Sequence, residues 1–199
     1  MKTVRDILII GAGGIGRETA WIIEEINEVK PTWNLLGYID ENSEMHGKEL
    51  NGYKVLGGLE ALEKLEEKPY VVVAIANCSV KKSIVAKLGE KYNFATIIYP
   101  TVRIHKSIEI AEGTIIYPGV ILTVNTKIGN HVLISENCTI GHDTVIGDYS
   151  SVLWGSNFSG YDTVGESCFI GVGTKVVQGI SIICESSIEA GITVIEEIK

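Results

Sequence analysis

The chain has 199 residues, of which 45% are hydrophobic, enough for one large or two small packed domains. Its net charge of −8 argues against a nucleic-acid partner, which would need a basic face. It contains no apolar run of about 18 residues, so we expect no membrane span. The charged start Met1–Asp6 lacks an apolar signal segment, and the four cysteines form no CxxC pair. Together these features predict a cytoplasmic protein.

The first part of the chain alternates between strand-like and helix-like patterns. Such alternation predicts a parallel sheet with helices on its faces, as in a Rossmann-like α/β domain. We place this domain at residues 1–97, because the apolar period changes after that point. The expected strands are 5–10, 35–39, 70–75 and 94–97, and the expected helical segments are 20–26, 59–65 and 80–88.

A glycine-rich turn joins the first strand to the first helix. It contains Gly11, Gly13, Gly14 and Gly16, a GxGxxG pattern in the context that gives the pattern value. Glycines let a phosphate approach the backbone, and the helix N-terminus offers unpaired N–H groups. Asp40 ends the second strand and could accept hydrogen bonds from a ribose or a base. The alternative is a tight turn without a ligand.

The size of this domain limits the ligand. A dinucleotide fold needs two βαβ halves, and about 97 residues hold little more than one. The sequence therefore favours a mononucleotide or a nucleotide sugar. Arg17 and Lys81 could neutralise its phosphate charge, unless they are ordinary solvated cations.

Every sixth residue is large and apolar from Ile98 onward. This spacing fits neither a helix, with an apolar period of about 3.6, nor a simple strand, with a period of 2. It predicts a parallel β-helix of triangular section, whose three six-residue sides make one coil. Residues 98–199 would form five to six coils. The seventeen apolar positions are Ile98, Ile104, Ile110, Ile116, Leu122, Ile128, Ile134, Ile140, Ile146, Val152, Phe158, Val164, Ile170, Val176, Ile182, Ile188 and Val194.

Small or β-branched residues recur four positions after these apolar residues. We expect the apolar side chain to fill the interior and the small one to fit the tight corner. Cys138 and Cys168 occupy this small-residue slot, so they are predicted to be buried, reduced thiols. Other examples are Thr114, Val132, Thr144, Ser150, Ser156, Thr174 and Ser186.

One histidine of the repeat region lies in a context suited to catalysis. His142 precedes Asp143 on a face of the predicted coil. An imidazole can remove a proton at neutral pH, and a neighbouring carboxylate can orient it. The alternatives are an exposed corner histidine without a role, or a zinc site of three histidines at a subunit interface. His105, His131 and His142 take different positions in their repeat units, so we expect no metal.

Five segments in a fixed order carry a resemblance to a known family. They are IIGAGGIGRE at 9–18, GYID at 37–40, VAIAN at 73–77, IGHDTVIGDYSSV at 140–152 and GYDTVGESCFIGVGTKVVQG at 160–179. This order resembles the sialic-acid O-acetyltransferase (NeuD-type) sugar acyltransferases, which include UDP-amino-sugar and perosamine N-acetyltransferases. The resemblance implies a left-handed β-helix after the Rossmann-like domain.

The resemblance implies a function and a set of roles. It implies a homotrimer that transfers an acetyl group from acetyl-CoA to an amino sugar, which is nucleotide-linked, in surface-polysaccharide synthesis. His142 would be the general base, Asp143 its neighbouring acid, and Gly160 would present a backbone N–H to the acetyl oxygen. Gly171, Val172, Gly173, Ala190 and Gly191 would lie along the pantetheine arm of the cofactor.

On the nucleotide side, the resemblance implies binding by the glycine turn, the acid and the third-strand loop. The residues are Gly11, Gly13, Gly14, Gly16, Asp40, Ala76, Asn77 and Lys81. The chain departs from the family at Ile15, where a histidine is usual, and at Ser151, where some members have a second histidine. Lys81 stands near the place of a family arginine and supplies a point charge instead of a fork.

Other functions stay open at this point. An enzyme of the same fold could acetylate a hydroxyl of sialic acid or of serine. A non-catalytic nucleotide-sugar-binding or assembly subunit is also possible, because the sequence ends at Lys199 without the family's loop over the coenzyme A tail. The sequence does not distinguish N- from O-acylation or identify the nucleotide.

Overall fold

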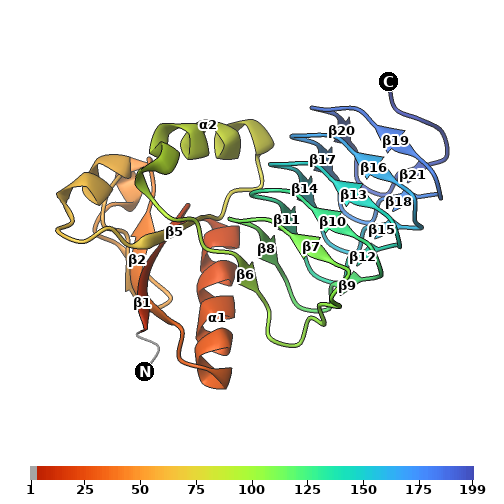
Figure 1. The fold of residues 1–199 in the computed structure, drawn as a ribbon. Coiled ribbons are helices and arrows are strands. Elements are labelled where there is room, and N and C mark those ends of the chain that lie inside the picture. Colours follow the sequence, from red (N-terminus) through yellow and green to blue (C-terminus); the bar gives the residue numbers. More distant parts are fainter. Residues whose placement is uncertain (1–3) are drawn as a thin grey trace.

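The computed structural model describes residues 4–199 (Figure 1). The first part contains a three-stranded parallel sheet in the order β2-β1-β5, as the alternating pattern predicts. Its strands are β1 (Arg5–Ile10), β2 (Trp33–Ile39) and β5 (Tyr70–Val73), and its helices are α1 (Gly14–Val29) and α2 (Cys78–Leu88). Within the described residues, no helix is both long and apolar enough to cross a membrane.

Several predicted elements of this part differ from the structure. The third strand ends at Val73 instead of residue 75, and the predicted helix 59–65 is a 3-10 helix, η2 (Leu59–Lys64). Of the predicted strand 94–97, Phe94 forms only an isolated bridge with Val71, and Ile97 begins β6 (Ile97–Ile98). The hairpin of β3 (Glu49–Leu50) and β4 (Tyr53–Lys54) was not predicted, because its strands are too short to show a period. Two further 3-10 turns are η1 (Ser43–Met45) and η3 (Gly89–Lys91).

The second part is a three-sided left-handed β-solenoid, which confirms the six-residue repeat. Its strands form three parallel sheets of five, six and five strands. Each strand pairs with the one 18 residues further on, for example Lys127 with Val145. The strands are β6 (Ile97–Ile98), β7 (Glu109–Ile110), β8 (Ile115–Ile116), β9 (Ile121–Leu122), β10 (Lys127–Ile128), β11 (Leu133–Ile134), β12 (Thr139–Ile140), β13 (Val145–Ile146), β14 (Ser151–Val152), β15 (Asn157–Phe158), β16 (Thr163–Val164), β17 (Phe169–Ile170), β18 (Lys175–Val176), β19 (Ser181–Ile182), β20 (Ser187–Ile188) and β21 (Thr193–Val194).

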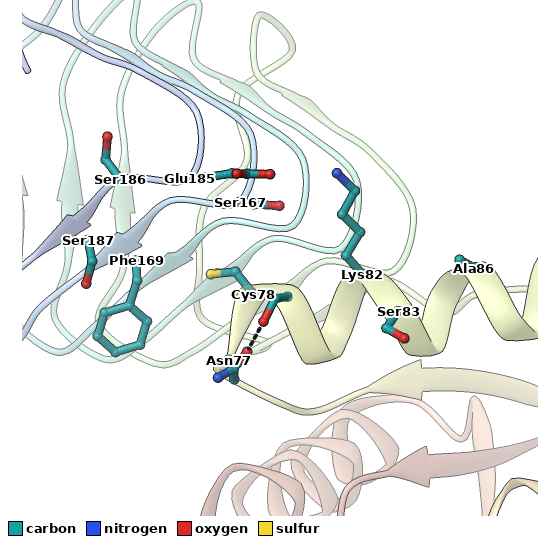
Figure 2. Close-up of a pocket in the computed structure, with 11 residues that line it drawn as sticks. Asn77, Cys78, Lys82, Ser83, Ala86, Ser167, Phe169, Glu185, Ser186 and Ser187 are labelled. Carbon is teal, nitrogen blue, oxygen red and sulfur yellow. Dashed lines mark hydrogen bonds between the residues drawn. The ribbon is translucent and has the colours of Figure 1, made fainter. Parts of the chain in front are cut away.

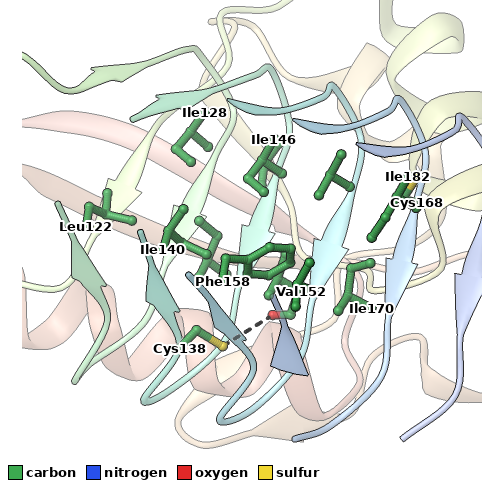
Figure 3. Close-up of a cluster of buried hydrophobic side chains, with 14 of the residues drawn as sticks. Leu122, Ile128, Cys138, Ile140, Ile146, Val152, Phe158, Cys168, Ile170 and Ile182 are labelled. Atoms are coloured by element: carbon green, nitrogen blue, oxygen red, sulfur yellow. Dashed lines mark hydrogen bonds between the residues drawn. The ribbon is translucent and has the colours of Figure 1, made fainter. Parts of the chain in front are cut away.

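The apolar residues of the repeat fill the interior of the solenoid (Figure 3). Ile140, Ile146 and Val152 are fully buried, one from each of the three sides. The prediction is wrong at Ile104, which is 42% exposed, because the segment between β6 and β7 forms no strand and is irregular. Val102 packs against the core there instead.

The small-residue slot faces the inside of the corners, where side chains bond the next coil. The Ser150 hydroxyl donates to the carbonyl of Gly165 at 2.9 Å. Cys138 and Cys168 are fully buried free thiols, as predicted, and the Cys138 thiol donates to the carbonyl of Leu153 at 3.2 Å. One slot holds a carboxylate, Asp162, which is only 1% exposed.

The two parts pack through the sheet that runs from β6 to β20. Its outward residues Ile115 and Leu133 share one buried cluster with Ile9 and Ala20 of the first part. The Tyr117 hydroxyl reaches across this contact and donates to the carbonyl of Ile15 at 3.1 Å. β6 is already paired with β8, so the chain enters the solenoid at the predicted position, although a domain boundary between residues 97 and 98 stays a prediction.

Candidate active site

His142 lies at a corner of the solenoid, which we call the histidine corner. The left-handed residues Asn125, Asp143 and Tyr161 stack there in successive coils. His142 Nδ1 lies 3.0 Å from Asp143 Oδ2, and the two side chains are 41% and 31% exposed. Since an ionised carboxylate only accepts, Nδ1 donates this bond, and no side chain or backbone group among residues 4–199 forms a hydrogen bond with Nε2.

A second hydrogen bond orients the carboxylate. The Asn125 amide donates to Asp143 Oδ1 at 2.9 Å from the coil below. This bond, followed by the bond from His142, lowers the pKa of Asp143, so the carboxyl is charged at neutral pH. The ring of Tyr161 packs edge-on against the imidazole at 4.9 Å between centroids. Asn125 was missed in the sequence, because its partner stands 18 residues away.

Gly160 forms the surface against which the imidazole lies. A Cβ atom at this position would stand 2.9 Å from His142 Nε2, so any side chain would displace the ring. The predicted role of its N–H as a donor to the acetyl oxygen stays a prediction. That N–H donates to Asp162 Oδ2 at 3.1 Å inside the corner, so it is already paired.

The glycine turn and Asp40 lie together at the carboxyl edge of the sheet. Asp40 Oδ2 accepts from the N–H of Ala12 at 2.7 Å. The turn is tight, since a Cβ at Gly11 would stand 2.8 Å from the carbonyl of Ala74. Gly13 and Gly14 face open space, and no side chain caps the N-terminus of α1. The first turn of α1 therefore offers uncapped N–H groups to an anion.

The third-strand loop leads from this edge into α2, where the prediction for Lys81 is wrong. Asn77 caps α2, accepting from the N–H of Val80 at 3.0 Å. Lys81 is 1% exposed and donates to Ser151 Oγ at 3.0 Å, so its ammonium faces the solenoid and not a ligand. Ser151 is thereby part of the packed junction. Arg17 is exposed and bonds the carbonyl of Gly13 at 3.3 Å.

A cavity of about 740 Å³ opens between α2 and the last coils of the solenoid (Figure 2). Asn77 and Lys82 line it from α2, and Phe169 and Ser187 line it from the solenoid. The Lys82 ammonium lies 2.6 Å from Glu166 Oε1, with both side chains nearly half exposed. Lys82, which the sequence analysis did not select, is therefore the lysine that lines this cavity.

The predicted cofactor residues lie at a second corner, which we call the glycine corner. Gly155, Gly173 and Gly191 stack there in successive coils, in the left-handed conformation and facing open space. Other corners carry Tyr149 or Ser167 in the same conformation, so the turn itself does not demand glycine. The result is a strip of bare backbone. Gly155 was missed, but its 18-residue spacing from Gly173 could have revealed it.

Gly171, Val172 and Ala190 flank this strip. A Cβ at Gly171 would meet the N atom of Ala190 at 2.6 Å, so this glycine serves the close approach of two coils. Val172 is 44% exposed beside Gly173. The glycine corner and the histidine corner stand at opposite ends of the side that contains β15, roughly 15–20 Å apart for a six-residue side. One chain therefore does not bring the predicted cofactor and base residues together.

The other histidines do not gather around His142. Among residues 4–199, no three His, Cys, Asp or Glu side chains are grouped to hold a metal ion. His105 bonds Ser107 at 2.9 Å. His131 is buried between Phe94 and Tyr149.

A β-solenoid with a partly exposed histidine–carboxylate pair, joined to an α/β part with a glycine-rich turn, is typical of the hexapeptide-repeat acyltransferases. Residues 6–88 match the family model of the PglD N-terminal domain, and residues 125–153 match that of the bacterial transferase hexapeptide. The chain is 31% identical over 174 residues to GDP-perosamine N-acetyltransferase of Escherichia coli O157:H7, covering 86% of this chain and 78% of the relative. It belongs to this family of sugar N-acetyltransferases.

Two further relatives agree with this placement. UDP-N-acetylbacillosamine N-acetyltransferase of Bacillus subtilis (strain 168) is 30% identical over 116 residues, which is 57% of this chain and 51% of the relative. Perosamine N-acetyltransferase from Caulobacter crescentus, solved with CoA and GDP-perosamine, has the same fold, with a TM-score of 0.88 at 23% identity over 98% of this chain and 91% of that one. Two of its structures are of variants in which one histidine is replaced by asparagine or alanine.

Proposed function

We propose that the protein transfers the acetyl group of acetyl-CoA to the amine of a nucleotide-linked amino sugar, with His142 as general base. The observation that carries the proposal is the partly exposed pair of His142 and Asp143, in which Nδ1 is bonded to the carboxylate and Nε2 has no hydrogen-bond partner among the described residues. The histidine variants of the Caulobacter crescentus relative, bound to CoA and GDP-perosamine, support a histidine at the centre of the reaction.

The geometry supports a simple sequence of proton transfers. The amine nitrogen attacks the thioester carbonyl as His142 Nε2 takes one of its protons, so a C–N bond forms and then the C–S bond breaks. The imidazolium returns that proton to the leaving sulfur, which gives the amide and free coenzyme A. Asp143 stabilises the transient charge on the ring, and its bond from Asn125 keeps Oδ2 directed at Nδ1.

The nucleotide sugar would run along the carboxyl edge of the sheet. Asp40 would hold the nucleoside, and the uncapped start of α1 at Gly13 and Gly14 would hold the phosphates. The edge continues past Asn77 into the cavity, where Lys82 supplies a cation in place of the buried Lys81. A volume of about 740 Å³ lies in the range of small-molecule sites.

The cofactor would lie on the glycine corner, where bare backbone leaves room for an extended pantetheine arm. Because this corner is remote from His142 in the same chain, we propose that the site forms between copies, with the glycine corner of one meeting the histidine corner of the next. A closed ring of copies satisfies such a head-to-tail contact, and a trimer matches the three-sided solenoid.

The test is a kinetic comparison of His142→Ala with His105→Ala. Loss of the base should lower kcat at least about 10²-fold, while the exposed His105, which lies between β6 and β7, should be dispensable. The acceptors would be UDP-, dTDP-, GDP- and CMP-linked amino sugars and free sialic acid, with mass analysis of the product. Full activity of His142→Ala would refute the base, and acetylation only of sialic acid would refute the amino-sugar acceptor.

A further inference from the structure

The small-residue slot of the solenoid contains one charged side chain, and it lies beside the candidate active site. The slot is filled elsewhere by uncharged residues that fit the corner. They are Thr114, Val120, Thr126, Val132, Cys138, Thr144, Ser150, Ser156, Cys168, Thr174, Ile180 and Ser186. Asp162 takes the same slot and is only 1% exposed.

The carboxylate of Asp162 is held by backbone groups. Its Oδ2 accepts from the N–H of Gly160 at 3.1 Å, and its Oδ1 accepts from the N–H of Ile180 at 2.9 Å. Among the ion pairs of residues 4–199, none includes Asp162. Burying a carboxylate without a cation costs free energy, and a threonine or serine would fill this corner without that cost. A residue that breaks the local rule next to a functional site indicates a functional reason.

The contact of Gly160 with His142 supplies that reason. The space beside the Gly160 Cα is closed by the imidazole, within 2.9 Å of a Cβ position. Gly160 also has a φ of +137°, a conformation in which glycine alone is comfortable and from which it can readily move. A charge-assisted hydrogen bond to its N–H removes this freedom. The position of the His142 ring therefore depends on the Gly160 peptide, whose N–H is hydrogen-bonded to Asp162.

We propose that Asp162 is a positioning residue for acetyl transfer, which fixes the Gly160 peptide and through it the imidazole of His142. This inference rests on the proposed role of His142 as base. It also accounts for the hydrogen bond that the Gly160 N–H donates inside the corner.

The experiment replaces Asp162 with the residue that the repeat itself prefers. Asp162→Thr should fold, since Thr144 and Thr174 are fully buried in the same slot. We expect a Tm at least equal to that of the parent, a kcat lowered at least 10-fold, and KM values for both substrates within about 2-fold. Asp162→Asn is the second variant, because its amide can accept from only one of the two N–H groups and should also lower kcat. Thr114→Ser, in the same slot at a remote corner, should leave kcat unchanged.

A second readout addresses the hydrogen bonds directly. In the parent protein the amides of Gly160 and Ile180 should exchange slowly with solvent deuterium, and Asp162→Thr should speed the exchange of both. An active Asp162→Thr enzyme, or an inactive one with unchanged exchange at Gly160, would overturn the proposal. His142→Ala in the same assay separates the two claims: if it is inactive while Asp162→Thr is fully active, only the positioning role fails.

Discussion

Two histidines at different corners of the solenoid differ in exposure and in their partners. His142 is exposed and paired with a carboxylate, whereas His131 is 4% exposed, stacks on Tyr149 and has an Nδ1 without a partner. Burial, and next the ammonium of Lys81, lower the pKa of His131 to about 4. A neutral ring there serves packing between the two parts.

This lowered pKa predicts a stability that depends on pH. The unfolded chain, with a histidine pKa near 6.5, binds the proton more tightly than the folded protein does. The free energy of unfolding should therefore fall as the pH drops from about 6.5 to about 4, by on the order of 3 kcal/mol. Urea unfolding at several pH values would measure it. His131→Phe, whose ring cannot titrate, should flatten this part of the profile, and an unchanged slope would contradict the assignment.

Gly160 allows a second prediction at the residue scale. In Gly160→Ala the new methyl group would stand 2.9 Å from His142 Nε2, so the ring must move and kcat should fall about 10²-fold. Gly52→Ala is the matched control, since Gly52 also has a positive φ, of +83°, but faces open space in the hairpin of β3 and β4, away from the histidine corner. Both variants carry backbone strain, so a similar loss of Tm with a loss of kcat in Gly160→Ala alone would separate displacement of the ring from strain.

At the scale of elements, the six-residue period predicted the solenoid because each repeat makes one flat side regardless of its partners. The exception, Ile104, lies in the irregular segment between β6 and β7, and a period alone does not mark such a segment. The short strands of the hairpin around Asn51 carry no period at all. Local patterns therefore gave the elements, whereas their contacts with distant residues were not predictable.

In the candidate site, too, local features could be predicted from the sequence, whereas contacts with distant residues could not. His142 and Asp143 are neighbours in sequence, so their pairing could be predicted. Lys81 was assigned to a ligand because a cation could neutralise phosphate charge and because it stands near the place of a family arginine. Its helix packs on the solenoid, a contact between residues about 70 apart, and this turns Lys81 inward. The adjacent Lys82 faces the cavity instead.

The proposal that Lys82, and not Lys81, binds the nucleotide sugar can be tested with one substitution. Lys82→Met removes the cation from the cavity and should raise KM for the nucleotide sugar about 10-fold with kcat nearly unchanged. Its ion pair with Glu166 is well exposed, so Tm should change little. Lys87→Met, at the far end of α2 and outside the cavity lining, is the control and should leave KM unchanged. An unaltered KM in Lys82→Met would remove this lysine from the site.

At the scale of the whole molecule, the separation of the two corners predicts complementation between inactive variants. His142→Ala lacks the base, and Gly173→Tyr fills the bare strip of the glycine corner with a side chain that Tyr149 shows to fit such a turn. If each site draws one corner from each of two copies, randomly mixed oligomers should regain about one quarter of the parent activity.

The measurement is the activity of the two variants after co-expression, compared with each variant alone. Sedimentation would establish the number of copies in the oligomer. If both corners of a site came from one chain, every site would keep one defect, and the mixture would stay as inactive as its components.

The α/β part covers only the early strands of the sheet from β6 to β20, and this limits where the chain could gain residues. The outward side chains of this sheet are buried at Ile115, Leu133 and Ser151 beneath the α/β part, half-buried at Phe169 and exposed at Ser187. A duplicated stretch of 18 residues among the early coils would shift this docking face and separate the halves. The same stretch added beyond Ser187 would preserve every contact, so natural lengthening should accumulate at the distal tip.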